Sequence, residues 1–131
     1  MEIFITVNWI AIVIAAVARF VVGAMWYSPM VFGKQWKETV GSSPSEVPEA
    51  IAVQAVGSLV MAYVLAQIIG HIGATDLWTG AVVGLMMWLG FVASIMLPGV
   101  MFEKRPMNFF FIYSGYQLVT MLVMGAIIAV W

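Results

Sequence analysis

The stretch IFITVNWIAIVIAAVARFVVGAMWY, residues 3–27, decides the fold. It is an apolar run in which Arg19 is the only charged residue. A helix needs roughly 20 such residues to cross about 30 Å of hydrocarbon. The run lacks the basic region and the A-x-A cleavage site of a signal peptide. We therefore expect a retained membrane-spanning helix.

Three further apolar runs follow, at about 50–70, 77–102 and 107–131. The chain is 64% hydrophobic and 8% charged, whereas a soluble domain carries about 25% charged residues. None of the runs alternates apolar and polar residues as a membrane barrel does. The sequence thus predicts one all-α domain, an integral membrane bundle of four transmembrane helices.

A weak internal repeat suggests that the bundle consists of two similar helical hairpins. VFGK at 31–34 resembles MFEK at 101–104, and LVMAYVLAQII at 59–69 resembles LVTMLVMGAII at 118–128. Chance matching between apolar segments is the alternative explanation.

The basic residues predict the orientation. Lys34 and Lys37 lie in the loop 30–49, and Lys104 and Arg105 lie in the link 103–106. The link 70–76 and both chain ends carry no Lys or Arg. Because loops rich in Lys and Arg stay in the cytoplasm, we expect these two loops there and both termini outside. The expected location is the bacterial inner membrane.

Composition excludes several classes of function. The net charge of −1 gives no reason to expect a nucleic-acid partner. The chain has no cysteine and one histidine, and it shows no catalytic triad, paired carboxylates or phosphate-binding loop. We therefore predict no metal, no cofactor and no enzymatic activity, with the lipid bilayer as the main partner.

Small residues recur at helical spacing and predict close helix packing, because helices in lipid associate through small residues. The packing serves either the bundle itself or an interface with a second copy or another membrane subunit. The second run carries Ser58, Ala62, Ala66 and Gly70, the third carries Gly80 and Gly84, and the first carries Ala11, Ala15, Arg19 and Gly23.

Arg19 is the most informative residue, because a charge at mid-bilayer costs from about 2.5 to above 10 kcal/mol. Its expected partners are a loop carboxylate such as Glu103, freed backbone carbonyls, polar side chains or a lipid phosphate. Three roles stay open: a snorkelling arginine, a structural polar cluster, or an anion- or substrate-binding site. Polar residues on the second and fourth runs complete the candidate cluster, namely Gln54, Ser58, Tyr113, Tyr116 and Gln117.

The segment WYSP at 26–29 resembles an active site but is explained as an aromatic anchor followed by a helix break. Arg19, Gly23 and Trp26 share one helix face at i, i+4 and i+7. We hypothesise that Trp26 stacks on the Arg19 guanidinium, with Gly23 clearing the space.

The connections carry their own signals. GKQWKETV at 33–40 predicts a short interfacial helix anchored by Trp36. Ser43, Pro44 and Glu46 match a capping box for the second span. Thr75 or Asp76 is expected to cap the third span. Pro98 and Gly99 predict a kink or stop near the end of that span.

These motifs together resemble a known family. The order GAMWYSPMVFGKQW, a polar loop, MAYVLA, GFVAS, FEKRP and YSGYQLVTMLVMGAI is similar to the small bacterial membrane proteins grouped as domain of unknown function 1761. Its most specific part is WYSP with the following Phe32, Gly33 and Trp36. The resemblance implies a four-helix integral membrane protein and brings no activity and no catalytic residue.

Two functional hypotheses follow. The first is a non-catalytic structural or accessory subunit of a membrane assembly, docked through the Gly80 and Gly84 face or the Ser58 to Gly70 face. The alternative is an oligomeric small-solute or ion permease, or a ligand-binding membrane protein, that uses the polar pocket around Arg19.

Overall fold

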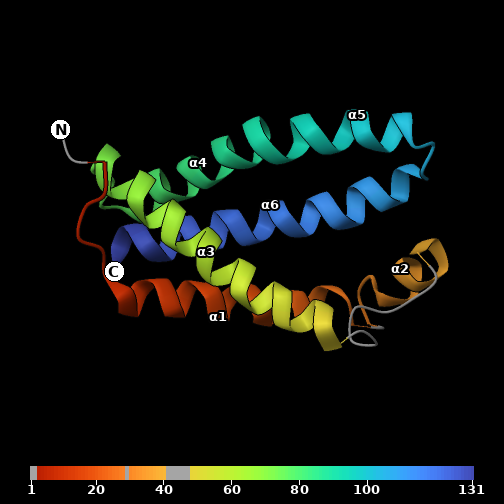
Figure 1. Cartoon of the computed structure of the whole chain (residues 1–131), viewed down its shortest axis with the longest axis horizontal. Helices are drawn as coiled ribbons and strands as arrows, with labels where there is room; N and C mark the ends of the chain where they lie inside the picture. Colours follow the sequence, from red (N-terminus) through yellow and green to blue (C-terminus); the bar gives the residue numbers. More distant parts are fainter. Residues whose placement is uncertain (1–2, 29, 41–47) are drawn as a thin grey trace.

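The protein is all-α, as predicted. The computed structural model describes residues 3–28, 30–40 and 48–131, and within these ranges it contains helices and no strand (Figure 1). In chain order the elements are α1 (Trp9–Trp26), α2 (Gly33–Val40), α3 (Pro48–Ile72), α4 (Leu77–Trp88), a π-helical segment η2 (Leu89–Ala93), α5 (Ser94–Phe102) and α6 (Met107–Val130).

Four helical stretches in the described part of the chain are long and apolar enough to cross a membrane. They are α1, α3, the continuous stretch α4–η2–α5, and α6. The capping box expected at Ser43, Pro44 and Glu46 lies outside the described residues, as does Pro29.

The first helix begins at Trp9, so the expectation of a helix from residue 3 is wrong there. Asn8 accounts for the difference: its Oδ1 accepts hydrogen bonds from the backbone N–H groups of Ile10 at 3.0 Å and Ala11 at 3.3 Å. A side chain that satisfies the free donors of the first turn defines a helix start.

The segment before α1 is tied to α3 by Gln67. The Gln67 Oε1 accepts from the Ile5 N–H at 2.9 Å, and its Nε2 donates to the Ile5 carbonyl at 3.0 Å. His71, one turn further on, bonds the Ile3 carbonyl through Nε2 at 2.6 Å. Beneath this segment lies an open, apolar cavity of about 360 Å³, lined in part by Phe4, Tyr63 and Val64.

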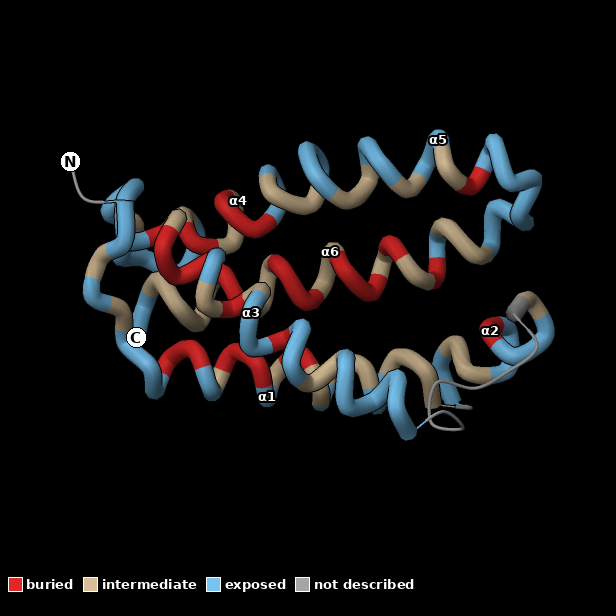
Figure 2. The backbone as a smooth tube through the Cα atoms, in the orientation of Figure 1, coloured by how far each residue is buried: buried red, intermediate tan, exposed pale blue. Residues whose placement is uncertain are grey.

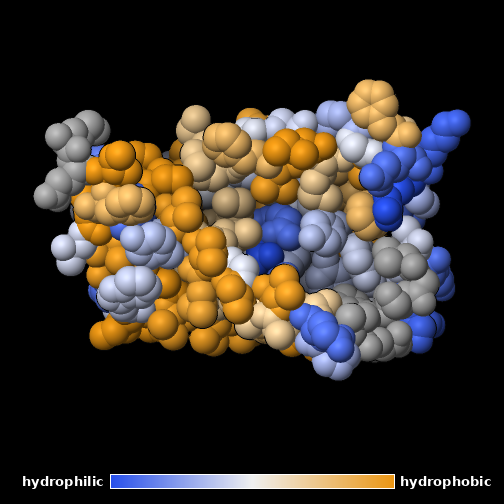
Figure 3. All heavy atoms as spheres, in the orientation of Figure 1, coloured by the Kyte–Doolittle hydropathy of each residue, from blue (hydrophilic) through white to orange (hydrophobic). Residues whose placement is uncertain are grey.

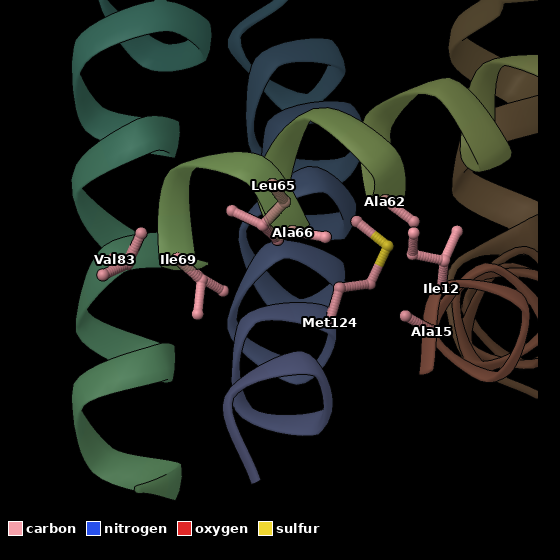
Figure 4. Close-up of a cluster of buried hydrophobic side chains, with 8 residues drawn as sticks. All are labelled: Ile12, Ala15, Ala62, Leu65, Ala66, Ile69, Val83 and Met124. Carbon is pink, nitrogen blue, oxygen red and sulfur yellow. The ribbon is translucent and has the colours of Figure 1, made fainter. Parts of the chain in front are cut away.

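The helices lie closer together at the end that holds both termini and spread apart towards the other end (Figures 1 and 2). At the packed end α3 crosses in front of α6, and side chains from four helices meet in one hydrophobic core (Figure 4). The apolar side chains outside this core are left on the surface, where they can face lipid. The core residues are Ile12, Ala15, Ala62, Leu65, Ala66, Ile69, Val83 and Met124.

Helices α4 and α6 approach each other most closely at glycines. A Cβ added to Gly80 would collide with the Gly125 backbone, and one added to Gly84 would collide with the Met121 backbone. The G-x-x-x-G pattern therefore serves packing inside the bundle, where small residues let two backbones meet.

The third span does not stop at Pro98. Helix α5 continues through this proline to Phe102, and the π-helical segment Leu89–Ala93 precedes it. The Ser94 hydroxyl donates to the Gly90 carbonyl within this irregular region. Local π geometry and Ser hydroxyls are the usual means by which a membrane helix tolerates proline.

The end of α1 turns sharply into α2, as the sequence predicts for residues 33–40. The Gly33 N–H donates to the Ser28 carbonyl at 2.8 Å, and the Phe32 N–H donates to the Trp26 carbonyl at 3.0 Å. A Cβ at Gly33 would collide with the Tyr27 and Ser28 backbone, so only glycine fits this turn. The turn directs α2 back towards α6, where Trp36 is buried.

The link between α3 and α4 follows two capping rules. Gly73 adopts φ +80°, and its N–H donates to the Ile69 carbonyl, which is the usual C-terminal cap. Asp76 caps α4 through bonds from Thr79 N–H at 3.0 Å and Thr79 Oγ1 at 2.6 Å. These hydrogen bonds lower the pKa of the Asp76 carboxyl.

Candidate functional site

Arg19 lies inside the bundle rather than at its surface. It sits seven positions before Trp26 on α1 and is 3% exposed. At a rise of about 1.5 Å per residue it is roughly 10 Å from the end of the helix. The guanidinium is thus held within the protein at a depth where lipid would otherwise surround it.

Three hydrogen bonds fix the guanidinium to two other helices. Nε donates to the Ser58 Oγ on α3 at 3.1 Å. Nη1 donates to the Gln117 Oε1 and the Thr120 Oγ1 on α6, both at 2.8 Å. One side chain therefore joins α1, α3 and α6.

The acceptor hydroxyls are themselves oriented by the helices. The Ser58 hydroxyl donates to the Gln54 carbonyl at 2.7 Å, and the Thr120 hydroxyl donates to the Gln117 carbonyl at 2.9 Å. Since each hydroxyl has only one proton, its lone pairs are turned towards Arg19.

Tyr116 lies against the flat face of the Arg19 guanidinium. The Arg19 guanidinium carbon lies 4.9 Å from the centre of the Tyr116 ring, within cation–π range. The Tyr116 hydroxyl donates to the Arg19 carbonyl at 3.2 Å and accepts from the Gln54 Nε2 at 3.1 Å. A Cβ at Gly23 would lie 2.9 Å from the Tyr116 hydroxyl oxygen, so Gly23 admits the tyrosine.

The hypothesis that Trp26 stacks on Arg19 is wrong. The Trp26 Nε1 instead donates to the Ile112 carbonyl at 2.9 Å, and its ring packs against Phe32 with centroids 4.8 Å apart. The ring that lies against the Arg19 guanidinium is that of Tyr116, as described above.

The structure brings together five of the predicted polar residues but places Tyr113 elsewhere. Arg19, Gln54, Ser58, Tyr116 and Gln117 form one hydrogen-bonded cluster, which we call the Arg19 cluster and in which we include Thr120.

Tyr113 belongs to an aromatic stack that seats α2. Its ring lies 5.7 Å from Trp36 and 5.8 Å from Phe109. Tyr27 connects this stack to the Arg19 cluster, with its ring 5.1 Å from Trp36 and 5.4 Å from Tyr116. The aromatic spacing alone does not indicate these contacts, because they depend on the turn at Gly33.

No carboxylate neutralises Arg19 within the spans. Helices α1, α4–α5 and α6 contain no Asp or Glu, and α3 has only Glu49 in its first turn. The expected partner Glu103 pairs instead with Arg105 in the exposed link, at 2.6 Å. The Arg19 cluster thus satisfies hydrogen bonds with neutral groups, and no carboxylate among the described residues compensates the charge.

The predicted packing residues are used inside the chain. Ala62 and Ala66 lie in the hydrophobic core, and Gly80 and Gly84 face α6. Gly70 contacts the Ile5 side chain. The sequence analysis does not predict one contact, the hydrogen bonds between Gln67 and the N-terminal segment. Its only signal was an amide within an apolar run.

Comparison with known proteins places the chain in a family and gives no functional relative. Neither the curated proteins nor the solved structures contain a match. A family model described as protein of unknown function (DUF1761) matches residues 10–129. That range covers all four membrane-long helices except the first residue of α1 and the last residue of α6. It contains the whole Arg19 cluster and agrees with the resemblance seen in the motifs. The chain therefore belongs to the family of proteins of unknown function DUF1761.

Proposed function

We propose that the protein is a non-catalytic structural or accessory subunit of a membrane assembly in the bacterial inner membrane. The observation that supports this most is the α4–η2–α5 stretch, which uses α6 as its main neighbour and leaves its other sides open. None of the π-helical residues is buried, and Val100 is the only buried residue of α5.

The open side of η2 and α5 suits contact with another helix. A Cβ at Gly90 or Gly99 would meet no atom within 4 Å, so both positions leave room for a close approach. The Ser94 hydroxyl is bonded within its own helix, so this surface presents little unpaired polarity to lipid. We infer that a second copy or another membrane subunit packs here.

The two docking faces expected from the sequence do not serve this role. The Gly80 and Gly84 face is covered by α6, and Ser58, Ala62 and Ala66 point into the bundle. Assembly through them would require the bundle to open. The proposed contact therefore moves to α5.

The Arg19 cluster also supports a non-catalytic role. Its members are an arginine, amides and hydroxyls, and within the described residues it contains no acid–base or nucleophile–base pair. Each hydroxyl already donates to a backbone carbonyl. Such a network fixes helix positions, as interhelical hydrogen bonds in membranes do.

The absence of native cysteine allows a direct test by cross-linking. Phe91→Cys in η2 and Ile95→Cys in α5 place thiols at exposed positions of the third span, and Val56→Cys is the control at an exposed position of α3. In native membranes we expect oxidant-dependent adducts, to a second copy or to another chain, for the variants in η2 and α5 and none for Val56→Cys. Absence of adducts at α5, together with a monomer by native mass spectrometry, would overturn the proposal.

A second candidate is an oligomeric permease or ligand-binding membrane protein. The specific observation in its favour is the charge on Arg19, which no carboxylate of the spans balances. A buried charge in a membrane protein usually marks a ligand or ion site. Uptake of a radiolabelled anion into proteoliposomes, compared with vesicles lacking protein, tests the transport form of this candidate.

A further inference from the structure

The Arg19 cluster has an excess of hydrogen-bond donors. The Arg19 Nε and Nη1 donate to Ser58, Gln117 and Thr120, but Nη2 has no acceptor among the described residues. Because an arginine can only donate, Gln117 must present Oε1 to Nη1 and turn its Nε2 away. That amide nitrogen also has no acceptor in the described ranges.

Both free donors keep some exposed surface. Arg19 is 3% exposed and Gln117 is 7% exposed. Within the described residues, however, the only fully enclosed side-chain polar atom that lacks a partner is the Ser114 Oγ. Nη2 and Nε2 are therefore not sealed inside the protein.

The surface of the molecule agrees with this accessibility. Between α3 and α6, Figure 3 shows a hollow with strongly hydrophilic atoms at its floor, bordered by hydrophobic side chains on the left and by weakly hydrophilic ones on the right. A polar floor beside apolar side chains is a favourable place for a charged group of opposite sign, because a low dielectric strengthens their attraction.

We propose that the Arg19 cluster binds a phosphate oxyanion, which accepts hydrogen bonds from the Arg19 Nη2 and the Gln117 Nε2. The ligand supplies the negative charge that the spans lack and the acceptors that both donors need. Arginine is the side chain best suited to phosphate oxygens. The depth of roughly 10 Å from the helix end is within reach of a lipid head group drawn inwards or of a soluble anion.

This inference deepens the ligand-binding candidate and does not depend on assembly through α5. The proposed anion site differs from a purely structural cluster in one respect. A purely structural cluster is complete without a ligand, whereas this site gains further stability when an anion is present. Binding to the folded state raises its stability with the logarithm of the ligand concentration once that concentration exceeds the dissociation constant.

The test uses the full-length protein in neutral detergent or in nanodiscs, followed by thermal unfolding. One arm adds inorganic phosphate in neutral detergent at constant ionic strength. The other replaces phosphatidylcholine by phosphatidylglycerol in nanodiscs. We expect a rise in melting temperature in at least one arm. A response to phosphatidylglycerol alone identifies a lipid phosphate, and a response to phosphate alone identifies a soluble ligand.

Gln117→Glu is the decisive variant. It is nearly isosteric and places a carboxylate beside Nη1, so the protein itself supplies the missing charge. We expect it to be more stable than wild type without added anion and to bind the anion at least about tenfold more weakly. Arg105→Gln removes the other arginine, which is exposed in the link, and serves as the control that keeps the response.

Three results would overturn the proposal. They are a wild-type protein that responds in neither arm, a Gln117→Glu variant that responds like wild type, and a Gln117→Glu variant that is less stable or does not fold. Cross-links at Phe91→Cys with no anion response would refute the anion site alone and leave the proposed assembly standing.

Discussion

At the scale of single residues, the cluster shows how a membrane bundle accommodates a charge. Arg19 is held by one hydroxyl on α3 and by an amide and a hydroxyl on α6. The partners are neutral, so their hydrogen bonds reduce the free-energy cost of burying the guanidinium but do not cancel its charge. Removing any one partner leaves a charged donor without an acceptor.

Tyr116→Phe tests the contribution of one hydroxyl. The change removes bonds to the Arg19 carbonyl and from Gln54, and it keeps the ring beneath the guanidinium. We expect a loss of about 1 kcal/mol in the free energy of unfolding. Reversible unfolding in mixed micelles with SDS, followed by circular dichroism, measures it.

The matched control is Tyr113→Phe. The Tyr113 ring packs on Trp36 and Phe109, and its hydroxyl makes no hydrogen bond in the described part of the chain. We expect no change in stability. An equal loss in both variants would show that the hydroxyl of Tyr116 has no special role.

At the scale of helices, the contact between α4 and α6 depends on glycines, which have no side chain to keep the two backbones apart. We expect Gly84→Ala to destabilise the protein by about 1–3 kcal/mol, because the new methyl group meets the Met121 backbone, which cannot move aside easily. Gly57→Ala on α3 is the control, since a Cβ there meets no atom within 4 Å. Unfolding in SDS compares them, and similar values for both would contradict the close approach.

The cap of α4 predicts a dependence on pH. Thr79 lowers the pKa of the Asp76 carboxyl in the folded protein. A depressed pKa contributes stability above the unfolded-state pKa, and this contribution is lost as the pH falls through the folded-state value. Asp76→Ala should therefore melt at a lower temperature than wild type at pH 7. The difference should shrink in acid, as thermal scans from pH 7 to pH 3 would reveal; a constant difference would exclude the carboxylate as the cause.

The sequence is sufficient to predict the helices but not all of their irregularities. The four apolar runs predict the bundle, and the polar face of the last run predicts most of the Arg19 cluster. The hydrophobic pattern does not mark Trp9 as the start of α1, because the apolar run continues across Asn8. The π-helical segment at Leu89–Ala93 and the uninterrupted passage through Pro98 also depend on tertiary context.

The site was harder to predict where contacts join distant segments. Gly23 was expected to make room for Trp26, but the residue it admits is Tyr116, from a helix more than 90 positions away in sequence. The choice between two aromatic residues depends on how α6 is rotated against α1. Periodicity along one helix carries no information about that rotation.

At the scale of the whole molecule, the two basic loops lie at the same end. Helix α2 and the link between α5 and α6 are at one end of the bundle, and both termini are at the other (Figure 1). This arrangement is compatible with cytoplasmic basic loops and external termini.

Labelling with a membrane-impermeant maleimide tests this orientation. Lys34→Cys lies in the first basic loop, and Thr75→Cys lies in the link between α3 and α4; both residues are exposed. In intact cells we expect labelling of Thr75→Cys alone, and after lysis labelling of both. The reverse pattern would place the basic loops outside, against the positive-inside rule.

The clamp on the N-terminal segment has a consequence for biosynthesis. Gln67 holds Ile5 by both its N–H and its carbonyl, although 62 positions separate the two residues. During translation the first helix therefore emerges and enters the bilayer well before its fastening exists. The segment before α1 therefore stays unbound on the side of the membrane where α3 ends. The hydrogen bonds between Ile5 and Gln67 can form only after α3 has crossed the membrane.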